Sequence, residues 1–538
     1  MAVYQRYGGI ALLGALLFLP ALGAVHLFDW DEINFAECAR EMIVSHDYLR
    51  MQIDYVPFWE KPPLFIWLQV LSMKLFGVNE YAARFPNALV GIATLLALYH
   101  VGRKVAGERR ALLWIGFYLA SWLPHFYFKT GIIDPLFNLL IFGAIYQLYQ
   151  LRTAVQWVPH AVWGGVFLGL AVLTKGPVAL IVTGLCFAVY VIVNRSFTGF
   201  GFGRLLAFAG VTLLVSASWF AVEVANNGWW FVKEFIEYQA GLFSQNIADH
   251  EEPWYYHPIV LLIGCFPASL LMIPVRSRAA HRHETAEKDF TRFMWILFWV
   301  VLILFSMVRT KIVHYSSLCY FPMTFLAARE VEAYLEGRKK LHQGLQAGLL
   351  FLGSVWAIIL IALPLVGIHK DALIPLIDDP FAVGNLSAKV PWSYAESLWG
   401  VLYLAGIWTA LLLLRRKPSK GILILFAVQV VAIQVTLLHF TPKIEAYSQR
   451  AAIEFFQSKA NEDCYVQVVG YKSYAHLFYT RKMPPQNPDS RNEEWLRTGP
   501  VDKPTYFVAK ITEKEALLSD PLLAFLGEKN GFVFFRRK

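Results

Sequence analysis

Residues 7–42 read YGGIALLGALLFLPALGAVHLFDWDEINFAECAREM, and this stretch joins an apolar run directly to an acidic segment. The run Tyr7–Val25 has close to the roughly 20 apolar residues that a helix needs to cross a bilayer. The spacing of Phe35, Cys38 and Met42 then predicts a short amphipathic helix. The stretch therefore predicts a chain that enters the membrane and presents acidic side chains where it leaves the lipid.

The rest of the chain repeats the apolar pattern. Of its 538 residues, 57% are hydrophobic and 16% are charged, and the mean hydropathy is +0.46. This balance excludes a disordered chain and an ordinary soluble enzyme. We expect about thirteen spans, the first of them an uncleaved helix rather than a signal peptide: Tyr7–Val25, Tyr81–Gly102, Ala111–Tyr127, Ile133–Leu151, Ala161–Leu173, Pro177–Val193, Leu205–Val224, Tyr256–Pro274, Phe293–Val308, His314–Ala328, Leu345–Gly367, Tyr394–Leu414 and Gly421–His439.

The net charge of +9 is explained by topology rather than by a nucleic-acid partner. With the N-terminus inside, the predicted cytoplasmic connections are short and rich in Lys and Arg, as the positive-inside rule requires. Examples are Arg103, Lys104, Arg109, Arg110, Arg152 and Arg415 to Lys417. The five cysteines show no CxxC spacing, so neither a zinc site nor a disulfide framework is indicated.

The long loops and the C-terminal tail fall on the outer, periplasmic face. These are loop 26–80, which we expect to contain interfacial helices, and loop 225–255. After a membrane domain at 1–440, the sequence of 441–538 becomes mixed polar. There we expect strands at Cys464–Gly470, Thr505–Ile511 and Gly531–Phe535 and helices at Glu445–Ala460 and Glu513–Leu526, which together make a small α/β domain.

Charged residues near membrane depth are costly, so each one is a candidate for function. Asp31 and Glu32 open the predicted interfacial helix, where they could also serve only as helix caps. Asp134 precedes Pro135 at the start of a span, and helix capping is again an alternative.

An acid and a base stand side by side at Glu60 and Lys61, between aromatic residues and Pro62-Pro63. A solvated surface pair is the simpler alternative, but the aromatic neighbours favour the membrane interface. Other candidate residues near the outer ends of spans, some of which could only snorkel to the interface, are Arg84, Lys129, Lys175 and Lys311. His250 lies in a cluster with Glu251 and Glu252 and could bind a divalent metal together with Glu60, although no fixed metal-binding spacing is present.

These motifs, in this order, resemble the membrane glycosyltransferases of the protein mannosyltransferase group, and most closely the bacterial transferases that place aminoarabinose on lipid A. The resemblance rests on Asp31-Glu32, Phe35-Ala36-Glu37, Arg40-Glu41-Met42, Trp59-Glu60-Lys61-Pro62, Leu173-Thr174-Lys175-Gly176, His250 with Pro253 to Tyr256, and Lys311 with Tyr315. The aminoarabinose transferases have an Arg three positions after the Asp, where this chain has Asn34. This departure leaves the sugar and the acceptor open.

The resemblance implies an α-helical polytopic protein with the C-type glycosyltransferase fold, a polyprenyl-phosphate sugar donor and an essential Asp at Asp31. It also implies a metal, either zinc, manganese or magnesium, held by Glu60 and His250. We expect a bacterial inner-membrane enzyme that inverts the anomeric centre and acts as a monomer on a lipid A-type glycolipid at the periplasmic face.

The expected chemistry assigns a role to each candidate residue. A phosphate leaving group needs positive charge rather than a strong acid, so Lys61, with Arg84, Lys175, Lys311 and Tyr315 as helpers, would bind the donor phosphate. A carboxylate would orient the acceptor and take its proton, which is the role expected of Asp31, with Asp134 as a second acid.

Two other functions remain open from the sequence. A protein O-mannosyltransferase would use the same motifs with a Ser or Thr acceptor. A secondary transporter would also have many spans and intramembrane charges, but transporters carry repeated halves with charges near the midplane. Here the charges lie toward one face, and no internal repeat is visible.

Overall fold

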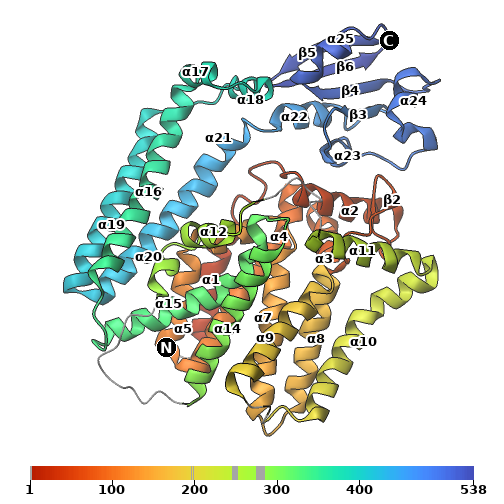
Figure 1. Ribbon diagram of the computed structural model, residues 1–538. Helices are drawn as coiled ribbons and strands as arrows, with labels where there is room; N and C mark the ends of the chain where they lie inside the picture. Colours follow the sequence, from red (N-terminus) through yellow and green to blue (C-terminus); the bar gives the residue numbers. More distant parts are fainter. Residues whose placement is uncertain (1–2, 196, 198, 245–251, 274–284) are drawn as a thin grey trace.

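The structure is a computed structural model that describes residues 3–195, 197, 199–244, 252–273 and 285–538. Most of the chain forms a bundle of long helices, and a small sheet domain lies beyond one end of it (Figure 1). The helices up to that domain are α1 Val3–Phe18, α2 Asp31–Ser45, α3 Leu64–Phe76, α4 Glu80–Ala106, α5 Glu108–Leu119, α6 Trp122–Phe126, α7 Asp134–Thr153, α8 Val158–Lys175, α9 Val178–Asn194, α10 Phe202–Asn227, α11 Trp230–Ser244, α12 Tyr256–Gly264, α13 Ala268–Leu271, α14 Thr285–Met307, α15 Tyr320–Leu335, α16 Gln343–Ile368, α17 Lys370–Leu373, α18 Pro380–Leu386, α19 Leu398–Arg416, α20 Pro418–Val435 and α21 Thr441–Glu445.

The helices have the length and composition of membrane spans. In the described part of the chain, seven helices are long and apolar enough to cross a bilayer, or up to eight if the bent pair Trp122–Lys129 and Asp134–Thr153 counts as one span. Each of the thirteen expected runs contains helix, but some of these helices are short or interrupted, as in α12 and α13. The count of thirteen therefore stays a prediction.

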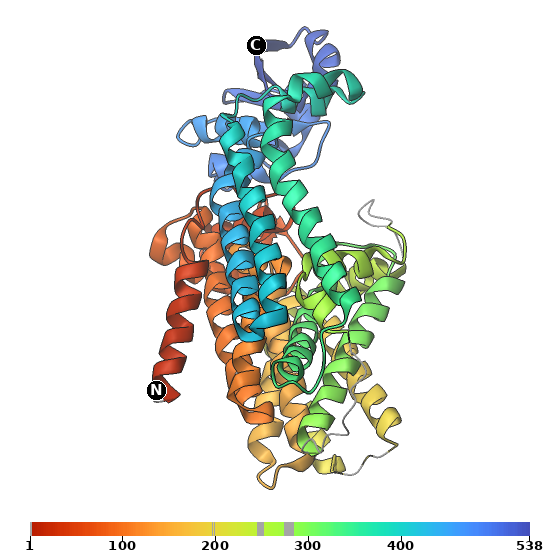
Figure 2. The same ribbon diagram turned by 90° about the vertical axis from the view of Figure 1, so that its left-hand side faces the viewer.

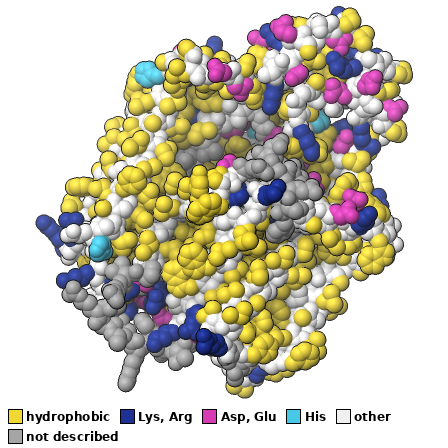
Figure 3. Space-filling model, viewed as in Figure 1, with side chains coloured by type: hydrophobic (Ala, Val, Ile, Leu, Met, Phe, Trp, Pro, Cys, Tyr) yellow, Lys and Arg dark blue, Asp and Glu magenta, His cyan; other side chains and the backbone are white. Residues whose placement is uncertain are grey.

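The outer surface of the bundle agrees with a lipid environment. Figure 3 shows apolar side chains spread over the bundle, while charged side chains gather on the sheet domain and near the opposite end. Leu206, Leu213 and Leu214 of α10 are exposed. In water these side chains would lose the stabilisation that burial gives them, whereas in lipid they are already in an apolar medium.

Small residues allow two of these helices to approach closely. Gly165 and Gly169 of α8 lie one helical turn apart and face α10. A Cβ at Gly165 would lie 2.7 Å from Val211 Cβ, and one at Gly169 would lie 2.6 Å from Val215 Cβ. This small-xxx-small pattern is typical of packing between membrane helices.

At the bundle end away from the sheet domain, buried ion pairs hold α14 in place. Arg110 of α5 pairs with Glu332 of α15 and, at 3.1 Å, with Glu287 of α14. Arg152 pairs with Asp289 of α14. Arg110 is buried, so the expectation of a solvated inner loop is wrong for this residue, because its charge is neutralised by acids on other helices.

The C-terminal domain contains a four-stranded sheet in the order β3-β4-β6-β5. The β3 and β4 strands are parallel, whereas β6 pairs antiparallel with both β4 and β5. Its elements are α22 Arg450–Ser458, β3 Tyr465–Val469, α23 Ala475–Thr480, α24 Glu493–Thr498, β4 Thr505–Lys510, α25 Lys514–Leu518, β5 Leu523–Lys529 and β6 Phe532–Arg537. A separate two-residue hairpin, β1 Gln52–Ile53 and β2 Val56–Pro57, lies in the first loop.

The expected helix at Glu513–Leu526 is partly wrong. The helix α25 ends at Leu518, shortly before Pro521, which disfavours helix at the residue that precedes it. The chain then forms the edge strand β5, which pairs with β6. The apolar run in this strand looks helical in sequence, and only its pairing with β6 decides otherwise.

The sheet domain is fixed to the first loop of the bundle. Glu445 lies 2.9 Å from His26, and Tyr479 accepts a hydrogen bond of 2.8 Å from the Leu27 backbone N–H. The Tyr55 hydroxyl donates to the Lys482 carbonyl at 2.7 Å. Figure 2 shows the domain stacked beyond the bundle end in a second view. These contacts place the C-terminal domain next to α2 and the residues that open it.

Candidate active site

Asp31 is the first residue of α2, but it does not cap the helix. The N-cap position is Trp30, and no side chain makes a capping hydrogen bond there. The Asp31 Oδ2 atom instead lies 3.6 Å from His314 Nε2. The Asp31 side chain is 32% exposed, so a bound molecule can reach this carboxylate.

Asp134 opens α7 in the same way and is turned toward the same histidine. Its Oδ1 atom accepts a hydrogen bond of 2.5 Å from Lys175 Nζ, and its Oδ2 atom lies 3.8 Å from His314 Nε2. Only 3% of the Asp134 side chain is exposed. His314 therefore lies between an accessible carboxylate and a buried one.

His314 was not among the residues selected from the sequence. It lies in the 3-10 helix η2 (Val313–Cys319) that follows α14. A signal was present, because His314 stands directly before Tyr315 and three residues after Lys311. The residue was missed because we placed it at the start of an apolar span.

Two of the expected phosphate-binding lysines lie at the cluster formed by Asp31, Asp134 and His314. Lys175, the last residue of α8, places its Nζ 5.0 Å from the centroid of the Tyr315 ring. Burial lowers the pKa of Lys61, while the negative charges of Glu60 and Asp31 act in the opposite direction. The two ammonium groups thus lie among the carboxylates of Asp31, Glu60 and Asp134, and an ammonium group is a common ligand of phosphate.

The expected acid Glu60 is held by α11. A side-chain hydrogen bond links Glu60 to Tyr238, and Gln239 Nε2 donates to the Glu60 carbonyl at 3.1 Å. The ring of Tyr238 also lies 5.0 Å from Lys61 Nζ. The α11 helix thus positions both members of the Glu60-Lys61 pair.

Lys311 is close in sequence to the cluster but is directed elsewhere. It is buried, and its Nζ lies 3.5 Å from the Arg309 carbonyl. Within the described chain, no ion pair joins Lys311 to Asp31 or Asp134.

The expectation that Arg84 helps to bind the donor phosphate is wrong. Its Nε and Nη2 atoms donate to the Glu32 carboxylate at 2.9 and 2.8 Å. Its other N–H groups donate to the carbonyls of Leu22, Val25 and His26, each at 2.8 Å. Five N–H groups are all that a guanidinium has, so none remains for a ligand. Arg84 thus connects the segment that follows α1 to Glu32 of α2.

Comparisons with known proteins agree with this arrangement. The sequence profile of the family described as dolichyl-phosphate-mannose-protein mannosyltransferase matches residues 60–230. The undecaprenyl phosphate-alpha-4-amino-4-deoxy-L-arabinose arabinosyl transferase of Edwardsiella ictaluri is 28% identical over 72% of each chain. The transferase of that name from Shewanella sediminis is 24% identical over 76% of this chain and 72% of its own.

The fold has been seen before in a solved structure. The crystal structure of ArnT from Cupriavidus metallidurans bound to undecaprenyl phosphate matches with a TM-score of 0.79 at 20% identity, and the match covers 99% of this chain and 98% of that one. The chain is a membrane glycosyltransferase that is similar to these proteins in sequence and in fold. Its apolar helices and its relatives make this transferase a multi-pass protein of the bacterial inner membrane.

The metal expected for the transferase stays a prediction. His250 lies outside the described residues, and the described part of the chain contains no group of three His, Cys, Asp or Glu residues that could hold a metal ion. Glu60 supplies one carboxylate there, already bound by Tyr238.

Proposed function

We propose that this transferase moves a sugar from a polyprenyl-phosphate donor to a lipid A-type glycolipid at the periplasmic face of the inner membrane. The observation that supports this most directly is the cluster itself, in which the accessible Asp31 carboxylate lies 3.6 Å from His314 beside the Lys175–Asp134 pair. The names of the similar transferases supply the donor class, and the acceptor class comes from the resemblance to the transferases that act on lipid A.

In the proposed reaction, an acceptor oxygen attacks C1 of the donor sugar. The bond between C1 and the phosphate oxygen breaks, and its electron pair leaves with the polyprenyl phosphate. The attack occurs opposite the leaving group, so the anomeric centre is inverted. A hydroxyl acceptor would lose its proton to Asp31, whereas a phosphate acceptor at neutral pH has no proton to lose.

The lysines stabilise the phosphate that departs. Lys61 and Lys175 would place ammonium groups where negative charge develops, and Tyr315 would add a hydroxyl donor. Asp134 keeps Lys175 in position through the 2.5 Å hydrogen bond, while its buried Oδ2 faces His314. Because positive charge is already in place before reaction, the leaving group needs no proton.

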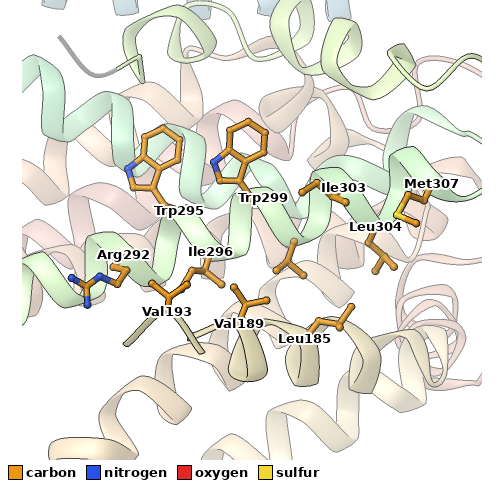
Figure 4. Close-up of a pocket in the computed structure, with 11 residues that line it drawn as sticks. Leu185, Val189, Val193, Arg292, Trp295, Ile296, Trp299, Ile303, Leu304 and Met307 are labelled. Carbon is orange, nitrogen blue, oxygen red and sulfur yellow. The ribbon is translucent and has the colours of Figure 1, made fainter. Parts of the chain in front are cut away.

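An apolar groove would hold the isoprenoid chain of the donor. It lies between α9 and α14, has a volume of about 520 Å³ and is lined by Leu185, Val189, Val193, Arg292, Trp295, Ile296, Trp299, Val300, Ile303, Leu304 and Met307 (Figure 4). From the Met307 end of the groove, the polypeptide continues through Lys311 to His314 and Tyr315. An isoprenoid bound in the groove would therefore lead toward His314 and the two carboxylates beside it.

Three further features belong to the proposal. The active site and the C-terminal domain face the periplasm, and the transferase acts as a monomer. A metal bound by Glu60 and His250 would hold loop 225–255 against loop 26–80 in a structural role. Elemental analysis of the purified protein and of its His250→Ala variant tests this assignment, because a metal held there would be lost from the variant.

The function is tested by mass spectrometry of lipid and secreted protein from cells with and without the gene. We expect a pentosamine or hexose increment to disappear from the lipid fraction. The profile match to the protein mannosyltransferases makes a protein acceptor the second candidate, and loss of the increment from secreted protein alone would select it. No change in either fraction would favour the transporter.

A further inference from the structure

One surface lysine of the C-terminal domain lies beside the residue that precedes Asp31. Lys472 is exposed, and its Nζ lies 5.1 Å from the centroid of the Trp30 ring and 5.7 Å from that of the Tyr474 ring. Trp30 directly precedes Asp31. A residue far along the chain thus brings a positive charge to the neighbour of the accessible carboxylate.

The position of Lys472 is set by its neighbours. The Ser473 hydroxyl donates a hydrogen bond of 2.5 Å to Asp29 Oδ2, and Ser473 Oγ accepts one of 3.1 Å from the Ala475 N–H. At the end of α23, Tyr479 binds the Leu27 backbone. Because Ser473 and Tyr479, which both follow Lys472, are fixed to the segment that precedes α2, the Lys472 ammonium group is held near Trp30.

Lys472 also differs from most lysines of its domain. Six of them make an ion pair with a carboxylate, namely Lys443, Lys459, Lys482, Lys503, Lys514 and Lys529. For Lys472 the described residues supply aromatic rings and no carboxylate ion pair. A cation over an aromatic face keeps N–H donors free for a ligand.

Both Trp30 and Asp31 are accessible from outside the protein. Trp30 is 45% exposed and the Asp31 side chain 32%, whereas only 3% of the Asp134 side chain is exposed. A molecule that contacts Asp31 and the exposed Trp30 ring together would be within reach of the Lys472 ammonium group.

We propose that Lys472 and Trp30 form a subsite for the acceptor, in which Lys472 binds a phosphate group of the glycolipid and the Trp30 ring packs against its sugar. This inference rests on the proposed function, because it assumes a phosphorylated glycolipid acceptor. A lysine is a compact point charge that suits phosphate, and an exposed indole ring offers a flat apolar surface to a sugar. The donor phosphate is bound deeper, by Lys61 and Lys175.

The test uses the full-length transferase in phosphatidylcholine vesicles with a polyprenyl-phosphate aminoarabinose donor. The acceptors are lipid A with its phosphates and the same glycolipid after removal of its phosphates. In Lys472→Met we expect the KM for phosphorylated lipid A to rise about tenfold, the value of one charge-assisted contact, with kcat and the donor KM unchanged. Lys472→Arg should restore most of the loss, and Lys503→Met, which removes a paired surface lysine of the same domain, should behave like the wild type.

Several outcomes would overturn the subsite. One is an unchanged KM in Lys472→Met, and another is an equal rise for both acceptors. An effect that arises only when phosphatidylglycerol is added would assign Lys472 to a phospholipid headgroup instead.

Binding of phosphorylated lipid A to the Asp31→Asn protein, with and without Lys472→Met, separates this inference from the proposed function. Binding that depends on Lys472 without transfer by the wild type would contradict the function and keep the subsite. Transfer that does not depend on Lys472 would support the function and contradict the subsite.

Discussion

At the scale of single residues, the structure distinguishes carboxylates that look equivalent in sequence. Asp31 and Asp134 both open helices and both fit helix capping. Neither caps its helix, and both lie within 4 Å of His314. Their exposure differs about tenfold, 32% against 3%, so the two residues should respond differently to substitution.

Asp31→Asn should abolish transfer and leave the protein folded, because its side chain is partly exposed. If the acceptor is a hydroxyl, the rate should fall by at least about 100-fold, the usual contribution of a general base. The initial rate in proteoliposomes and the thermal unfolding temperature of the purified protein measure the two effects. Asp134→Asn is the comparison. It leaves the Lys175 charge without its partner and should cost about 3–5 kcal/mol of stability as well as activity. Normal transfer by Asp31→Asn would exclude Asp31 as the base.

Lys61 predicts a pH dependence. Burial lowers its pKa, so the ammonium group loses its proton at a lower pH than the roughly 10.4 of an ordinary lysine. The donor KM should therefore rise as the pH increases through that lowered pKa. In Lys61→Arg the charge persists, because an arginine stays protonated up to about pH 12, and the rise should vanish. Donor KM values measured from about pH 7 to about pH 10 test this. An identical rise in both proteins would assign it to another group.

Arg84→Met should act on stability rather than on donor binding. It leaves the buried Glu32 charge unpaired, which should cost about 3–5 kcal/mol. Adding Glu32→Gln should recover part of this loss. Chemical unfolding in detergent measures the stability, and the donor KM of the folded fraction should stay that of the wild type. A raised donor KM at unchanged stability would show instead that Arg84 binds the donor phosphate.

At the scale of elements, a short helix and a loop from opposite ends of the chain share one contact. Ser473, which precedes α23, binds Asp29, which precedes α2. The same first loop is fixed from its other end, where the N–H groups of Asp54 and Tyr55 donate to Glu41 at 2.6 and 2.8 Å. The first loop is therefore held before α2 by the C-terminal domain and after α2 by Glu41 of that helix.

Burial of Asp29 should become less favourable as the pH rises. Burial raises the pKa of Asp29 from 3.8 to about 6, partly offset by the hydrogen bond from Ser473. Its contribution to stability is therefore fully present below pH 3.8 and is lost as the pH rises through about 6. Limited proteolysis of the C-terminal domain should be faster above that pH than below it. Asp29→Asn, which stays uncharged, should show no such difference, and a persisting difference would point to another titrating group.

At the scale of the whole molecule, the two ends of the bundle differ in charge chemistry. The end away from the sheet domain carries buried Arg–Glu and Arg–Asp pairs and many surface cations. The other end carries the cluster, the first loop and the C-terminal domain. The positive-inside rule predicts that the first end faces the cytoplasm.

Reporter fusions test this orientation. Alkaline phosphatase is active only after export, so a fusion after Lys538 should be active and one within Arg338 to Lys340 should be inactive. A fluorescent protein that matures only in the cytoplasm should give the opposite result at both positions. Active phosphatase at Arg338 to Lys340 would reverse the proposed topology.

The sequence alone determined what depends on local composition. Its hydropathy predicts membrane helices, its local residue pattern predicts the strands β3, β4 and β6, and its ordered motifs indicate the kind of enzyme. These inferences succeed because a bilayer selects apolar length and because each motif is contiguous in the chain. The importance of Asp31, Lys61, Asp134 and Lys175 stays a prediction.

The tertiary structure alone decided which charged groups meet. It placed His314 between Asp31 and Asp134 and brought Lys472 to Trp30. It also bound all of the Arg84 N–H donors within the protein and formed β5 by its pairing with β6. The partners in these contacts are separated by many residues in the chain. Their pairing depends on how helices and domains pack, because a buried charge is stable only beside the partner that packing brings to it.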